Sequence, residues 1–138
     1  MNRQDIVQQL VTELKTISGI NDNVYSEFYM WDDIPTGQYP VLIVQAGMEM
    51  ANYEGKSTLD TDFRAIIYGY VLSYETRETL LNELIQDVRT IIHADPTSNG
   101  LTMDRQMVSI ATDEGIQKPH GIFRMEVKCW THEYVASR

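Results

Sequence analysis

The sequence predicts an α+β fold, a mostly antiparallel sheet with two helices packed on one face, in the order αβββαββ. Two segments have the apolar period of an amphipathic helix, and five others have the alternation or β-branched content of strands. The strands occur in runs and do not alternate regularly with helices, which disfavours a doubly wound fold. With 138 residues, 43% of them hydrophobic, we expect residues 1–138 to form a single domain.

The first helix is expected over residues 5–17, where Gly19 is placed to end it. Its apolar residues recur with the period of an amphipathic helix: Ile6, Leu10, Leu14 and Ile17. Residues 24–29 alternate briefly and predict a short strand. The residues after them, up to Gln38, are rich in turn formers and predict a loop.

Three segments follow that predict a strand, a loop and a second strand. Residues 41–48 are apolar and β-branched, as in a half-buried or central strand. The acidic segment 49–60 has no helical period, and we expect a long hairpin loop there. In the strand expected over 61–72, apolar side chains occupy both faces, so both faces should be covered.

The second helix is expected over residues 75–93, where a broad apolar stripe repeats. Turn signals follow at Asp95-Pro96, and strands are expected over 106–112 and 122–134. In the last strand, one alternating set should meet the helices: Phe123, Met125, Val127 and Cys129.

The opposite face of the sheet is unusually aromatic. It combines Trp130 and Tyr134 with Tyr68 and Tyr70, if the strands align in that sense. Such an area indicates a second layer or a neighbouring subunit, and plain solvent exposure is the alternative.

The charge balance argues against specific nucleic-acid binding. The chain has 11 Lys and Arg residues against 20 Asp and Glu residues, a formal net charge of −9 at pH 7. Phosphate backbones repel such a surface. No apolar run approaches the ~20 residues that span a bilayer, and the single cysteine, Cys129, cannot form an internal disulfide. We therefore expect a protein of a reducing compartment that does not enter membranes.

Motifs for catalysis are mostly missing, and we expect no cofactor and no metal. Cys129 and His132 have an odd spacing on a strand and should face opposite sides, so they cannot chelate one ion together. Asp60 and Asp62 share a strand face and are candidates for a carboxylate pair, although charged loop ends explain them better. A small carboxylate-dependent hydrolase is the alternative from a different functional class.

Taken together, three stretches resemble the tail terminator, or tail-completion, proteins of long-tailed bacteriophages. They are residues 6–17, the block 34–44 with its loop and the strand 63–72, and the helix 80–92 followed by residues 95–101. The two closing strands complete the pattern. The resemblance covers nearly the whole chain and rests on order and spacing more than on signature residues.

The resemblance implies a structural virion protein, assembled in the host cytoplasm, with no catalysis. Such a subunit forms a six-membered ring on the head-proximal end of the tail tube, stops tube polymerisation, and contacts the head-closure and neck proteins. DNA passes through the ring without specific binding. A head-closure or stopper protein is the related alternative.

From these readings we select ten candidate residues for a subunit interface or the ring lumen. Four acidic side chains are assigned to the lumen or the tube, because a negative channel repels DNA uniformly: Glu49, Glu54, Asp60 and Asp62. A solvated hairpin is the alternative for this segment. The others are Tyr53, Lys56, Tyr68, Tyr70, Trp130 and Tyr134.

Overall fold

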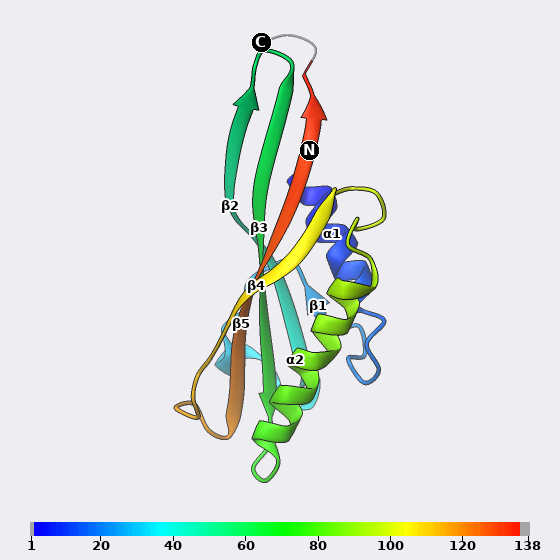
Figure 1. The fold of residues 1–138 in the computed structure, drawn as a ribbon. Coiled ribbons are helices and arrows are strands. Elements are labelled where there is room, and N and C mark those ends of the chain that lie inside the picture. The colour runs from blue at the N-terminus through cyan, green and yellow to red at the C-terminus, as the bar shows by residue number, and fades with distance from the viewer. Residues whose placement is uncertain (1, 136–138) are drawn as a thin grey trace.

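The predicted order of elements is confirmed in the structure, a computed structural model that describes residues 2–135. The helices are α1 (Arg3–Leu14) and α2 (Arg77–Ala94), and the strands are β1 (Val24–Tyr25), β2 (Val41–Glu54), β3 (Thr58–Leu72), β4 (Asp104–Thr112) and β5 (His120–Tyr134). Short 3-10 helices, η1 (Trp31–Asp33) and η2 (Thr36–Gln38), lie between β1 and β2. The strands form a sheet in the order β1-β2-β3-β5-β4, in which β1 is parallel to β2 and the other pairs are antiparallel (Figure 1).

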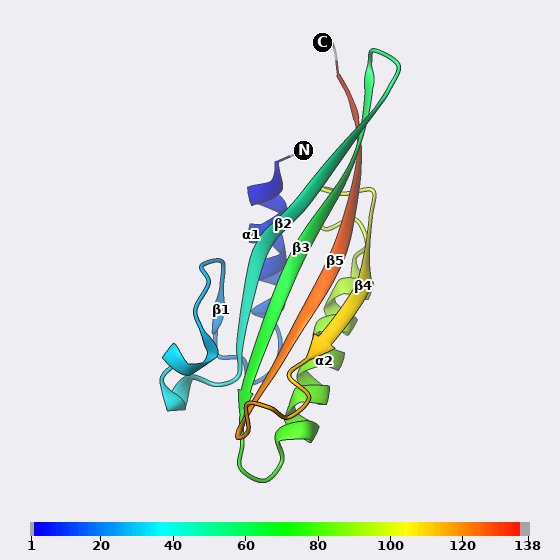
Figure 2. The ribbon, with the colours of Figure 1, turned by 90° about the vertical axis from the view of Figure 1, so that its left-hand side faces the viewer.

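Both helices pack on the same face of the sheet, as predicted, and lie behind it in Figure 2. The alternating residues of β3 and β5 form the floor of this core, where Phe63 and Phe123 are fully buried. Gly69 leaves the space that the Phe123 ring occupies, because a Cβ at Gly69 would lie 2.0 Å from the ring. Neither described helix is long and apolar enough to cross a bilayer.

The other face of the sheet is covered near β1 by the chain itself. Val41, Ile43 and Tyr70 are buried there. Side chains from the segment between β1 and β2 pack over them: Tyr25, Trp31, Ile34 and Tyr39. The expectation that both faces of β3 need cover is thus confirmed, and over this part the cover is a second layer from the same chain.

Several boundaries differ from the prediction for local reasons. Helix α1 begins earlier than expected because the Asn2 side chain accepts hydrogen bonds from the first-turn amides of Gln4 and Asp5. It ends at Leu14, before the turn in which Gly19 has a φ of +86°. The strand expected over 24–29 has only two residues, after which the chain leaves the sheet towards η1.

A buried arginine joins both helices to the edge of the sheet. Arg105 on β4 donates to the Glu13 carboxylate of α1 through two nitrogens, with N–O distances of 3.0 and 2.5 Å. Its Nε and Nη2 also donate to the carbonyls of Ile92 and Ile91 in the last turns of α2, both at 3.1 Å. One guanidinium therefore fixes α1, α2 and β4 relative to one another.

Replacing Arg105 by alanine should lower the free energy of unfolding by about 3–5 kcal/mol, because it leaves the half-buried Glu13 carboxylate and two carbonyls without a donor. Arg105→Lys should recover only part of this loss, since lysine lacks the planar fork. The measurement is urea unfolding, with Arg124→Ala, an exposed arginine on β5, as the matched control. Equal losses for Arg105→Ala and Arg124→Ala would contradict the joining role of Arg105.

Candidate functional site

Three strands extend beyond the helices and form a projecting arm. The arm consists of residues 48–54 of β2, residues 58–62 of β3 and residues 130–134 of β5. Figures 1 and 2 show these strands running past α1 and α2, with the C-terminal end of β5 beside the tip of the β2–β3 hairpin. None of these residues belongs to the two hydrophobic clusters of the described chain, so the arm has no core of its own.

The prediction of a long loop over residues 49–60 was wrong, because most of this segment is in strands. In the structure β2 continues to Glu54, a tight turn follows in which Gly55 has a φ of +68°, and β3 starts at Thr58. The alternation was hidden by a β-bulge, because the register of β2 against β3 shifts between Ala46 and Glu49. Asn, Glu and Gly also have low strand propensity, so the composition indicated a loop.

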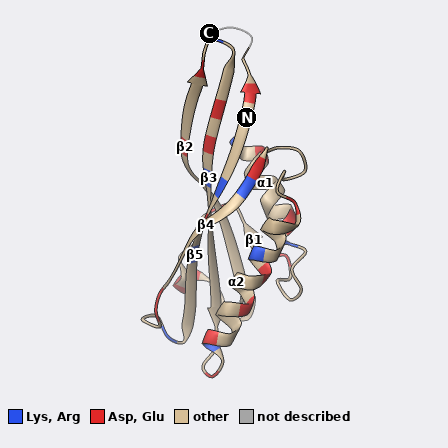
Figure 3. Ribbon diagram, viewed as in Figure 1, with Lys and Arg blue, Asp and Glu red and all other residues tan. Residues whose placement is uncertain are grey.

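The structure distributes the predicted residues over both faces of the arm. The outer face, opposite the helices, carries Glu54, Asp60, Asp62, Trp130 and Tyr134. Glu49 and Tyr53 lie on the other face, and Lys56 lies in the turn. Figure 3 shows acidic residues in the arm part of β3 and near the ends of β2 and β5. The four acidic candidates are thus gathered in one region, although on two faces.

Sequence analysis missed two methionines of the arm. Met48 and Met50 are 66% and 61% exposed, which is unusual for apolar side chains of this size. The candidates Tyr53, Trp130 and Tyr134, on the same arm, are also exposed. The signal was present as an apolar run up to Met50, but the bulge changes which of its residues face the core.

On the outer face, Asp60 and Asp62 contact basic side chains. The Asp62 carboxylate accepts from Arg64 at 2.9 Å and lies 3.8 Å from the Lys128 ammonium. Arg64 also reaches Glu126 at 3.4 Å. The His132 ring contacts Asp60 directly. The shared strand face of Asp60 and Asp62 is confirmed, but each carboxylate has a basic partner.

This pairing lowers the pKa of Asp62, whereas a general acid needs a raised one. The hydrogen bond from Arg64 holds the pKa of Asp62 below its ordinary value of 3.8, despite partial burial. A general acid at neutral pH needs a raised pKa. The geometry therefore favours an ion-paired surface over a hydrolytic carboxylate pair.

The two tyrosines of the predicted aromatic face have different environments from Trp130 and Tyr134. Tyr70 is 2% exposed, its hydroxyl donates to the Tyr29 carbonyl at 2.8 Å, and burial raises its pKa to about 12. Tyr68 is half-buried, with the Phe28 ring edge-on at 5.2 Å. Assigning Tyr70 to an outer interface was wrong, because the segment after β1 covers it.

The other chemical candidates are placed as predicted or lack partners for catalysis. Cys129 is buried on the helix side, where burial raises its pKa to about 12, and His132 is exposed on the opposite face. The opposite orientation of these two side chains is confirmed. Among residues 2–135, no three His, Cys, Asp or Glu side chains gather as metal ligands would.

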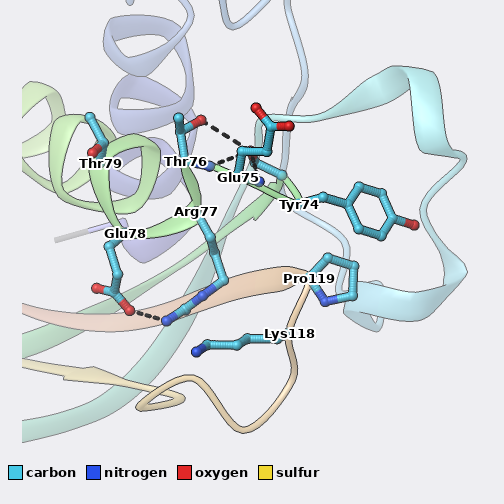
Figure 4. Close-up of a pocket in the computed structure, with 9 residues that line it drawn as sticks. Tyr74, Glu75, Thr76, Arg77, Glu78, Thr79, Lys118 and Pro119 are labelled. Carbon is cyan, nitrogen blue, oxygen red and sulfur yellow. Dashed lines mark hydrogen bonds and ion pairs between the residues drawn. The ribbon is translucent and has the colours of Figure 1, made fainter.

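A hollow of about 410 Å³ opens where α2 begins, beside the loop before β5. Figure 4 shows Arg77 and Lys118 at its wall, with Tyr74 and Pro119 across from α2. Arg77 is already held by Glu78 and, at 3.3 Å, by Asp113. No histidine or cysteine is among the described residues that line the hollow, so it offers no nucleophile–base pair of the usual kind.

Replacing Asp62 by asparagine should lower the free energy of unfolding at pH 7 by about 0.2–1 kcal/mol, the range for partly exposed ion pairs. Because the folded-state pKa of Asp62 is depressed, its stabilisation is present above the unfolded-state pKa and is lost as pH falls through the folded-state pKa. The gap between wild type and Asp62→Asn, measured by urea unfolding, should therefore close below pH ~4. A gap that is constant with pH, or one equalled by Asp87→Asn on α2, would contradict the pairing.

The chain was also compared with known proteins. No curated protein matches it. The model of the family described as Bacteriophage Tail Tube Terminator Protein matches residues 2–136, which is nearly the whole chain and includes the arm. This match confirms the resemblance found in the order and spacing of the sequence. The chain therefore belongs to the bacteriophage tail tube terminator family and is a structural protein of a phage tail.

Proposed function

We propose that this protein caps the head-proximal end of the tail tube as a ring, stops tube polymerisation there, and forms part of the neck between head and tail. The family match over residues 2–136 carries the proposal and favours a terminator over a head-closure protein. Tail tube protein and neck proteins are its partners, and the ring is six-membered.

The exposed side chains of the arm support the proposal that the protein functions as an oligomer. A three-stranded ribbon in which only Thr61 and Thr131 are buried, among its described residues, contributes little stability by itself. Its exposed apolar side chains, such as Met50 and Tyr134, gain stabilisation when a partner removes them from water. A ring of identical subunits supplies such a partner at every arm.

The acidic side chains of the arm have a role in the same proposal. Glu49, Glu54, Asp60 and Asp62 face the lumen or the tube end and keep passing DNA from binding to the wall. Their contributions differ, because Asp62 is partly neutralised by Arg64 and Lys128, and Asp60 is bonded to the His132 ring. Glu49 and Glu54 therefore supply most of the negative potential.

The assembly state is the first test. Light scattering over a wide range of protein concentrations should reveal a species of about six subunit masses, and negative-stain images of it should show a ring with an open channel. If the tube end is needed as a template, the monomer should instead bind purified tail tubes. A monomer at every concentration that also fails to bind tubes would rule out the proposed cap.

The lumen assignment is tested by neutralising the arm. The variant carrying Glu49→Gln, Glu54→Gln, Asp60→Asn and Asp62→Asn should still fold and form rings, while infectivity falls because DNA adheres during passage. The control carries the same number of neutral replacements at exposed acidic residues outside the arm: Glu83→Gln and Asp87→Asn on α2, Glu75→Gln in the loop before it, and Glu27→Gln after β1. Unchanged tail length and infectivity in the arm variant would contradict the assignment.

A further inference from the structure

Besides the two-residue terminal strand β1, two longer strands of the sheet have one side open. β1 pairs with β2 only at Leu42 and Ile43, so from Val44 to Glu54 no other strand of residues 2–135 lies beside β2 except β3. β4 has β5 on one side and, within the same residues, no strand on the other. Each open side presents peptide N–H and C=O groups that a further strand can bond.

The composition of the β2 edge is that of a strand prepared for pairing. Exposed edges are usually protected by lysine, proline or inward charges. The β2 edge contains no lysine, arginine or proline, and its exposed side chains include Met48 and Met50. In β4 the inward-facing Arg105 and a bulge at Val108, which is 43% exposed, give the edge partial protection, and β2 has a bulge after Ala46. Beyond its bulge, the β2 edge has neither lysine nor proline to oppose the approach of another strand.

Access to the β2 edge is also open. A cleft of about 440 Å³ lies along its first residues, between α1 and Val44, Gln45 and Ala46. Beyond it the edge belongs to the arm, which projects free of both helices in Figures 1 and 2. A strand can therefore reach the arm part of β2 without displacing an element of the fold, whereas at Gln45 it would replace the hydrogen bond that the side chain donates to the Ser26 carbonyl at 2.6 Å.

The register of the sheet places the two open edges at the same height. Met50 of β2 is level with Asp62, then Trp130, then Asp104 of β4. Val44 is likewise level with Ile67, then Met125, then Ile110. Because three antiparallel pairings separate them, β2 and β4 also run in opposite directions.

A flat ring requires that the two edges are level and run in opposite directions. Rotation about an axis along the strands, without a rise, moves the β4 edge of one copy beside the β2 edge of the next, antiparallel and level. Met50 and Asp104 both lie on the outer face, so the faces of the two sheets also continue into each other. Self-pairing of two β2 edges would instead bring Glu49 and Glu54 of both copies together.

We propose that residues 104–110 of β4 in one copy pair antiparallel with residues 44–50 of β2 in the next, so that the sheets of the ring form one continuous wall. Met50 then lies opposite Asp104, and Val44 opposite Ile110. The inference rests on the proposed ring and names the surface that closes it. The partner is a second copy of this chain.

Disulfide trapping tests the register. Met50→Cys and Asp104→Cys are made in separate proteins, mixed, assembled and treated with a mild oxidant, since opposed strand residues have the spacing a disulfide needs. A cross-linked dimer is expected in the mixture and in neither protein alone. The matched control replaces Asp104→Cys by Gln86→Cys, an exposed residue of α2, and should give no cross-link. The native Cys129 is buried and stays in place.

The outcomes separate the edge pairing from the ring itself. Intact rings without the Met50–Asp104 cross-link would overturn the edge pairing and leave the proposed function standing. A cross-link in the Met50→Cys protein alone would show a two-fold pairing of β2 edges and overturn it as well. Protein that forms no ring and binds no tube would overturn both proposals.

A second variant tests the same edge without oxidation. Val108→Lys places a charged side chain on the open side of β4 and should raise the subunit concentration needed for half-assembly by about tenfold or more. Asn82→Lys on the exposed face of α2 adds the same charge elsewhere and should leave that concentration unchanged. Unfolding by urea checks that both variants keep the fold. Equal assembly by the two variants would overturn the pairing.

Discussion

The unequal lengths of strands and helices shape this molecule. A strand of 15 residues, as in β3 and β5, spans about 50 Å, whereas the 18 residues of α2 span only about 27 Å. Neither helix spans the sheet alone, and the two lie one after the other along it, α1 against β1 and β2 and α2 against β3, β5 and β4 (Figures 1 and 2). Arg105 joins their C-terminal ends, because it binds both Glu13 of α1 and the last turns of α2. The uncovered remainder is the arm.

The two ends of the sheet differ in how the face opposite the helices is covered. Near β1, the chain covers the second face with its own segment, and Tyr70 is sealed below Tyr29. Along the arm, neither face has such a layer, and the outer face carries side chains paired as ions around Arg64. Ion pairing satisfies the charged groups of that face, while Met48, Met50 and Tyr134 of the arm remain exposed.

Periodic sequence patterns were sufficient to predict the elements and their order. The stripe of α2 and the alternation of β5 were clear because each side chain set meets a single environment. The hairpin was missed because the bulge after Ala46 reverses the alternation, and the cover over Tyr70 was missed because residues 26–40 have no period at all. The acidic candidates were found from composition, but two of their partners, His132 for Asp60 and Lys128 for Asp62, lie on β5, distant in sequence.

The lack of a core in the arm has a consequence for how the sequence of this protein can diverge. Residues 48–54 and 130–134 add nothing to the hydrophobic clusters, so substitutions there alter what the arm contacts far more than whether the chain folds. Around Phe63 and Phe123, by contrast, close packing restricts every exchange. Over evolutionary time the exposed residues of the arm can therefore change more freely than those around the two buried phenylalanines.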